Sequence, residues 1–224
     1  MTVNITKRIQ ELRETLPSQV RLIAVTKTVS AEKMREAYAA GIRDFGENKI
    51  QEALTKQEQL QDLEDISWHF IGHLQTNKAK LALTHFDWIH TCDRAKIAQR
   101  LDRLTPELAI KPPNLLLQVK PLSDPDKYGW TIPELLAALP TLDQYQNLNI
   151  QGLMTILPFN QSVSEMRTGF EKVRDLAQEI DQKNHSHLVM KELSMGMSAD
   201  YAIALEAGAT MIRLGRTIFG ERST

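Results

Sequence analysis

The sequence contains one cysteine, Cys92, in 224 residues. A single cysteine cannot form an internal disulfide, so a disulfide-stapled fold is excluded and a reducing, cytoplasmic compartment is expected. No run reaches the roughly 18 apolar residues of a membrane-spanning helix, and the charged segment 1–16 lacks the apolar stretch of a signal peptide. The formal net charge of −1 gives no general attraction to nucleic acid or to an anionic membrane, so neither partner is expected.

The sequence also lacks the Gly-x-Gly-x-x-Gly motif of a dinucleotide-binding open sheet. Instead, short apolar runs alternate with helical patterns after a first helix at 5–15. The expected strands are centred near residues 23, 44, 69, 89, 117, 153, 192 and 213. Eight strands separated by helices predict an α/β fold of parallel strands, closed as a single (β/α)8 TIM barrel over 1–224 with an extra N-terminal helix. A doubly wound open sheet is the alternative.

Lys27 closes the apolar run 22–25, which is predicted to be a strand buried on both faces. Ligands bind at the carboxyl ends of the strands in such folds. Burial disfavours an ammonium, so we expect the pKa of Lys27 to fall below about 10.4 and its amine to become nucleophilic. The alternative is a lysine that simply leaves the strand for water.

The segment after the seventh strand, 194–200, reads Ser-Met-Gly-Met-Ser-Ala-Asp and is predicted to enter a helix at Ser198. Small residues, hydroxyls and backbone N–H groups at a helix start can bind an anion. The segment 215–217 follows the eighth strand, and the loops after strands seven and eight form the usual phosphate site of such barrels. An ordinary cap by Ser198, with Gly196 as a turn residue, explains the same residues without a ligand.

Arg213 lies inside the eighth predicted strand, on the same face as Gly215. A buried arginine requires a partner, which is either a carboxylate in the barrel or an acceptor atom on a ligand. Lys27, a phosphate cradle and a deep arginine together describe a site for pyridoxal 5′-phosphate (PLP). A guanidinium can only donate, so the pyridine nitrogen opposite it would stay unprotonated and the ring would be a weak electron sink.

Longer motifs carry a resemblance that spans nearly the whole chain. They are Ala-Val-Thr-Lys at 24–27, Phe-Gly-Glu-Asn-Lys-Ile-Gln-Glu at 45–52, Trp-His-Phe-Ile-Gly-His-Leu-Gln-Thr-Asn-Lys at 68–78, Gly-Leu-Met at 152–154, Leu-Ser-Met-Gly-Met-Ser-Ala-Asp at 193–200, and Ile-Arg-Leu-Gly at 212–215 with Ile-Phe-Gly at 218–220. In these segments the sequence resembles the YggS/PROSC family of PLP homeostasis proteins. Those proteins are single-domain barrels similar to the N-terminal domain of alanine racemase (fold type III).

The resemblance implies that Lys27 forms the PLP aldimine. It places Ser198, Gly215 and the backbone of Arg216 at the phosphate, Arg213 at the ring nitrogen and Asn48 near the cofactor. Met154 and Ser194 complete the expected cofactor-binding set. The sequence departs from many relatives at Arg216, where a smaller polar residue is common, and at Lys49, where an aromatic residue is common. No metal is expected.

The same site could serve a carrier or an enzyme. A racemase needs a second acid/base on the opposite ligand face, and in alanine racemase a second domain supplies it. This sequence ends soon after the eighth strand, so we expect no such domain; the candidate replacements are Tyr128, Tyr201, His73 and Lys120. The leading hypothesis is therefore a PLP homeostasis protein without dedicated catalysis, expected to be monomeric, with free amino acids or apo-enzymes as partners. A PLP-dependent amino-acid racemase and a cofactor-free lysine aldolase are the alternatives.

The remaining polar residues receive structural predictions. His69 is expected to be a hydrogen-bonded core residue, Cys92 a small core filler, and the spacing of His185 and His187 accidental. Glu47 is expected to orient a neighbour or to pair with Arg43 or Lys49. The charged helix predicted after Asn48 is expected to be a solvated face.

Overall fold

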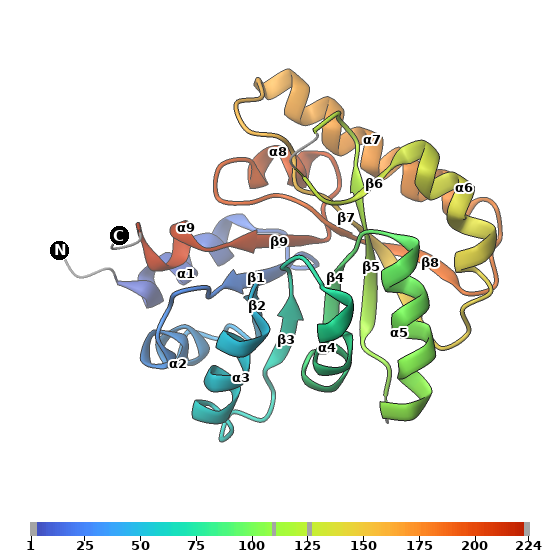
Figure 1. Ribbon diagram of the computed structural model, residues 1–224. Coiled ribbons are helices and arrows are strands. Elements are labelled where there is room, and N and C mark those ends of the chain that lie inside the picture. The colour runs from blue at the N-terminus through green and yellow to red at the C-terminus, as the bar shows by residue number, and fades with distance from the viewer. Residues whose placement is uncertain (1–3, 109–110, 125–126, 222–224) are drawn as a thin grey trace.

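The computed structural model describes residues 4–108, 111–124 and 127–221, so the predicted domain bounds at 1 and 224 lie outside the described residues. Eight parallel strands form a closed barrel with helices around it (Figure 1). The barrel order is β4-β3-β2-β1-β9-β8-β7-β5, and β5 pairs with β4 to close it. The predicted (β/α)8 barrel is confirmed, and the open-sheet alternative is wrong.

The strands are β1 (Arg21–Val25), β2 (Asp44–Glu47), β3 (Ser67–Phe70), β4 (Trp88–Cys92), β5 (Asn114–Lys120), β6 (Trp130–Thr131), β7 (Asn149–Met154), β8 (Leu188–Ser194) and β9 (Met211–Leu214). The helices are α1 (Ile5–Thr15), α2 (Ala31–Ala39), α3 (Ile50–Gln59), the 3-10 turn η1 (Thr76–Lys78), α4 (Ala79–His85), α5 (Ala95–Leu108), α6 (Ile132–Leu142), α7 (Val163–Asp181), α8 (Tyr201–Glu206) and α9 (Arg216–Phe219).

Capping residues mark the starts of three helices. Thr131 and Ser162 form full capping boxes at α6 and α7, each with a glutamate three residues later. The extra helix α1 begins after Asn4, whose side chain accepts a hydrogen bond from the Lys7 N–H. It packs beside α2 and α9, which brings the two ends of the chain to the same side of the barrel (Figure 1).

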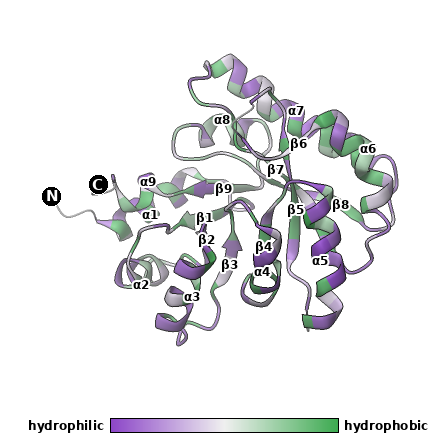
Figure 2. Ribbon diagram, viewed as in Figure 1, coloured by the Kyte–Doolittle hydropathy of each residue, from purple (hydrophilic) through white to green (hydrophobic). Residues whose placement is uncertain are grey.

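Two hydrophobic layers follow from the alternation of side chains along each strand. Ala24 and Leu214 belong to the outer layer between strands and helices, where hydrophobic residues recur on every helix (Figure 2). A smaller cluster lies inside the barrel and consists of Ile23, Trp88, Leu116, Met154 and Met211. Arg213 is two residues from Met211 and therefore also faces the barrel interior.

The structure adds one strand that was not predicted and corrects the predicted start of one helix. The two-residue strand β6 pairs with the end of β5 outside the barrel and has no apolar run that would have revealed it. Helix α8 begins at Tyr201 rather than at Ser198. Within 4–108, 111–124 and 127–221, no helix is both long and apolar enough to cross a membrane.

Candidate functional site

Lys27 is the second residue after β1, at the carboxyl end of the barrel, and is half-buried. The chain turns there, because the Val29 N–H donates to the Thr26 carbonyl at 2.8 Å. Thr28 has a φ of 64°, in the left-handed region that non-glycine residues seldom occupy. The backbone on both sides of Lys27 must therefore be held by contacts from elsewhere in the fold.

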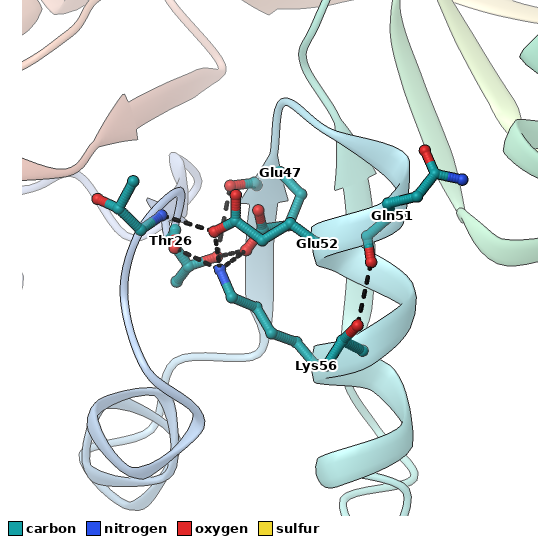
Figure 3. Close-up of polar contacts among 8 residues, drawn as sticks. Thr26, Glu47, Gln51, Glu52 and Lys56 are labelled. Atoms are coloured by element: carbon teal, nitrogen blue, oxygen red, sulfur yellow. Dashed lines mark hydrogen bonds and ion pairs between the residues drawn. The ribbon is translucent and has the colours of Figure 1, made fainter.

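Helix α3 supplies those contacts (Figure 3). The Lys56 Nζ donates to the Thr26 carbonyl at 2.7 Å, and the Glu52 carboxylate accepts from the Thr28 N–H at 2.6 Å. Lys56 and Glu52 also pair with each other, with 2.6 Å between Nζ and Oε1. The peptide groups that flank Lys27 are thus bound to two charged side chains one turn apart on one helix.

Glu47 completes this rim cluster, which consists of Thr26, Glu47, Glu52 and Lys56. Its fully buried carboxylate lies 2.7 Å from the Lys56 Nζ and accepts from the Thr26 hydroxyl at 2.6 Å. Burial raises the pKa of Glu47, although the Lys56 ammonium opposes that shift. Glu47 Oε2 has no hydrogen-bond partner among the described residues. A buried acceptor without a hydrogen bond costs free energy, so this oxygen of Glu47 lowers the stability of the rim cluster.

The rim cluster corrects two predictions. Glu47 pairs with Lys56 and not with Arg43, which instead binds Asp65 with 2.6 Å between Nε and Oδ2. The helix after Asn48 is not wholly a solvated face, because Lys56 is only 6% exposed. A lysine at this position of an otherwise charged helix gives no sequence signal of burial.

The loops after β8 and β9 lie beside the strand that carries Lys27. In the β1–β9 ladder Ala24 pairs with Leu214, and a Cβ added to Gly215 would lie 3.3 Å from the Val25 carbonyl oxygen. The backbone N–H of Arg213 donates to the Gly196 carbonyl at 3.0 Å, which joins the loop after β8 to strand β9. Helix α9 begins at Arg216, and the first N–H groups of a helix have no partner inside it.

Ser198 does not cap a helix as one interpretation predicted. Asp200 is the residue before α8, and its carboxylate accepts from the Met197 N–H at 2.6 Å. Gly196, with a φ of 94°, turns the chain ahead of that bond. The Ser198 hydroxyl is therefore available to the neighbouring loop, where it accepts from the Thr217 N–H at 3.4 Å.

Arg213 is 3% exposed, and it binds neutral acceptors rather than the carboxylate that one interpretation expected. Its Nη1 donates to the Ser194 hydroxyl and its Nη2 to the Thr155 carbonyl, both at 2.7 Å. Burial lowers the pKa of Arg213 to about 10, and the charge of Asp200 acts in the opposite direction. The guanidinium is still protonated at pH 7, so the barrel interior holds a positive charge.

The other expected site residues lie at the same end of the barrel. Asn48 follows β2, and its buried Oδ1 has no partner among the described residues. Gly72 follows β3, and a Cβ there would lie 2.1 Å from the Asn48 carbonyl oxygen, so only glycine fits. Met154 ends β7, is fully buried, and belongs to the interior hydrophobic cluster. Ser194 ends β8 and is also fully buried.

The candidate acid/base groups have different environments. His73 stacks on Tyr128 with 3.6 Å between ring centroids, and its Nδ1 lies 2.9 Å from the Asp93 carboxylate. Tyr128 is 58% exposed, as a loop-surface residue. Tyr201 packs partly against the core, and the Lys120 ammonium donates to the Asp124 carbonyl at 3.4 Å. Of the four, His73 is the candidate whose side chain is oriented by a carboxylate, that of Asp93.

The structural predictions for His69 and Cys92 are confirmed. His69 is buried and hydrogen-bonded, and Cys92 is buried in the outer core, where burial raises the pKa of its thiol. The part of the chain that the structure describes contains no group of three or more His, Cys, Asp or Glu residues that could hold a metal. Lys56 and His90 are buried polar residues that sequence analysis missed.

Three comparisons connect this architecture to known proteins. Residues 2–223 match the family model described as "Alanine racemase, N-terminal domain". A Synechocystis sp. relative named "Pyridoxal phosphate homeostasis protein" is 51% identical over 212 residues, which is 95% of this chain and 96% of the relative. PipY of Synechococcus elongatus, solved with PLP bound, is 48% identical with a TM-score of 0.91, over 96% of this chain and 100% of PipY.

A more distant likeness concerns the fold alone. Alanine racemase of Clostridium difficile is 12% identical, with a TM-score of 0.76 over 99% of this chain and 57% of the racemase. The sequence identity, the coverage and the barrel together lead to one conclusion. The chain belongs to the alanine racemase N-terminal domain family, and within it to the family of the pyridoxal phosphate homeostasis proteins.

Proposed function

We propose that this chain binds PLP through Lys27 and takes part in intracellular PLP homeostasis, by storing, buffering or delivering the cofactor without dedicated catalysis. When bound, PLP supplies an aldehyde that joins reversibly to an amine. The proposal is supported by the family and by the relative PipY, whose structure is described as having PLP bound. The single cysteine of the sequence supports a cytoplasmic location.

The observation that carries the proposal is the meeting of three features at one end of the barrel. A half-buried lysine follows β1, the Gly215–Arg216 backbone lies beside that strand, and a buried guanidinium lies within the neighbouring strand β9. The buried Asn48 Oδ1, which has no partner within 4–108, 111–124 and 127–221, suits a donor group on a ligand.

Each residue is assigned a role within this proposal. Lys27 would supply the amine, and the rim cluster would hold the peptide groups on either side of it. The backbone at Gly215 and Arg216, with the Ser198 hydroxyl, would bind the phosphate. Arg213 would face the ring nitrogen as a permanent donor. Asn48, Met154 and Ser194 would line the remainder of the pocket.

Absorbance spectroscopy with added PLP tests the proposal. We expect wild-type protein to become yellow, and borohydride reduction followed by peptide mapping to locate the cofactor on Lys27. Lys27→Ala should lose that fixed adduct, whereas Lys49→Ala, at an exposed lysine of the next loop, should keep it. Protein that stays colourless with PLP would refute the function, and an adduct retained in Lys27→Ala would refute the choice of lysine.

Amino-acid racemisation is the alternative, and the His73–Asp93 pair at 2.9 Å is the observation that favours it. Turnover of D- or L-alanine well above that of free PLP, lost in His73→Ala, would establish it. Under our proposal the protein instead exchanges PLP with free amino acids or with lysines of apo-enzymes. We also propose that it acts as a monomer.

A further inference from the structure

Hydrogen-bonded side chains cross the barrel interior from its amino end to Arg213. Asp44 Oδ1 lies 2.9 Å from His69 Nε2, and His69 Nδ1 lies 2.9 Å from His90 Nε2. His90 Nδ1 lies 2.9 Å from Ser194 Oγ, which accepts from Arg213 at 2.7 Å. We call these five residues the interior chain. Each comes from a different strand: β2, β3, β4, β8 and β9.

The interior chain runs along the barrel axis rather than around the rim. Asp44 is the first residue of β2, at the amino end of the barrel, where its Oδ1 lies 3.5 Å from the Arg21 Nη1. Ser194 is the last residue of β8, at the carboxyl end. His69 and His90 between them are fully buried, whereas the Asp44 side chain is 21% exposed. A carboxylate at one end of the barrel is thus linked to a guanidinium near the other.

The donor and acceptor capacities of these groups fix the direction of every hydrogen bond in the interior chain. A guanidinium can only donate, so Ser194 Oγ accepts from Arg213. The Asp44 carboxylate can only accept, so with both histidines neutral the Ser194 hydrogen goes to His90 Nδ1. His90 then carries its proton on Nε2 and donates to His69 Nδ1. His69 in turn carries its proton on Nε2 and donates to Asp44. All four bonds point from the positive end to the negative end.

Both histidines are neutral in this arrangement, which agrees with their environment. Burial lowers the pKa of His69, and burial together with the charges of Arg213 and Arg21 lowers the pKa of His90 further. Neutral imidazoles with fixed tautomers transmit orientation without adding charge to the interior. The interior chain therefore contains one cation and one anion, separated by three neutral groups.

We propose that the interior chain, from Asp44 to Ser194, positions Arg213 for the ring nitrogen of PLP. This inference rests on the proposed function. A carboxylate in direct contact would take two guanidinium N–H groups in a bidentate pair and hold the fork in its own plane. The interior chain takes a single Nη1 donor through Ser194, while the Thr155 carbonyl takes an Nη2 donor. The guanidinium is thus held by two neutral acceptors, and the carboxylate that orients the interior chain lies at its far end.

Asp44→Asn tests the inference, because it removes the charge and keeps a similar shape. Binding is measured for PLP and for 1-deaza-PLP, an analogue in which a C–H group replaces the ring nitrogen. We expect the variant to bind PLP about tenfold more weakly, the effect of one weakened bond to a charged group. We expect its affinity for 1-deaza-PLP to change less than twofold. In Asp44→Asn the absorbance maximum of bound PLP should shift from its wild-type position, whereas that of bound 1-deaza-PLP should not.

Asp87→Asn is the matched control. Asp87 lies at the same end of the barrel and accepts from the Trp68 N–H at 2.8 Å, but it is outside the interior chain. We expect it to keep wild-type selectivity between the two cofactors. His69→Asn is a second variant, since its amide oxygen can accept from His90 while the donor to Asp44 is lost. It should reproduce the PLP-selective loss if Asp44→Asn folds poorly.

The outcomes separate this inference from the proposed function. Equal losses for both cofactors, no loss for either, or the same selective loss in Asp87→Asn would each overturn the positioning role while leaving PLP binding intact. Wild-type protein that binds neither cofactor would overturn the proposed function itself. A loss confined to PLP in both Asp44→Asn and His69→Asn would establish the role of the interior chain.

Discussion

Two buried polar regions of this barrel handle charge in opposite ways. In the rim cluster, Lys56 touches Glu47 and Glu52 directly, and the three charges lie within one short part of the chain. In the interior chain, Arg213 and Asp44 never touch, and three neutral side chains from distant strands connect them. Direct contact fixes the backbone around Lys27, whereas the separated arrangement fixes the side chain of Arg213.

The largest expected effect comes from Lys56→Met in the rim cluster. It would leave the fully buried Glu47 carboxylate without its cation, and breaking a buried pair costs about 3–5 kcal/mol. Urea unfolding of the apo protein at pH 7 measures the loss. Lys183→Met, which removes the exposed pair with Glu179, should cost less than about 0.5 kcal/mol. Equal losses in the two variants would show that the rim cluster contributes no more than a surface pair.

Acid should weaken the interior chain before it weakens the rim cluster. His69 and His90 have folded pKa values below the ordinary 6.5, so below pH 6.5 the unfolded chain binds more protons and the fold loses stability. Each histidine contributes a slope of up to about 1.4 kcal/mol per pH unit. Glu47, whose pKa is raised, acts in the opposite direction, because the folded state takes up its proton first.

Unfolding free energies at pH 7.0, 6.0 and 5.5 measure that response. We expect the change of unfolding free energy per pH unit to be smaller in His69→Asn than in wild-type protein, by about the contribution of one histidine. An unchanged slope in that variant would contradict the neutral state assigned to His69. The same series in Glu47→Gln separates the opposing contribution of the rim cluster.

The smallest expected effect belongs to the exposed side of the rim cluster. Glu52→Ala removes the acceptor for the Thr28 N–H, and because the Glu52 side chain is 26% exposed, water can replace it. We expect a loss of about 1 kcal/mol and slower uptake of PLP, since the turn at Lys27 is less firmly held. Glu58→Ala, at an exposed position of the same helix, is the control for both measurements. Unchanged uptake would mean that Lys56 alone holds the turn.

The parts of this protein that depend on local pattern were predicted from the order of residues. Apolar runs bounded by turns indicated eight strands, and the barrel contains all eight. The position of Lys27 at a strand end also follows from such a run. The cofactor roles of Asn48, Met154, Ser194, Ser198, Arg213, Gly215 and Arg216 stay predictions.

The misplaced features depend on contacts that no local pattern encodes. Ser198 does not cap a helix because α8 begins at Tyr201, and Asp200 holds the preceding turn by accepting from the Met197 N–H. Lys56 looks like a surface lysine, and only the packing of α3 against the turn after β1 buries it. His69 was expected to be satisfied in the core, but nothing in its surroundings in the sequence identified His90 or Asp44 as its partners.

The order of residues alone indicated that this chain forms a barrel of parallel strands, with Lys27 just beyond the end of one strand and Arg213 within another. Hydrophobic burial and side-chain alternation act over a few residues, so the local sequence is enough to specify them. Which charges touch and which are kept apart depends on packing in three dimensions. Closing the barrel brings β2, β3, β4, β8 and β9 around one interior, and each buried polar group must then find its partner on another strand.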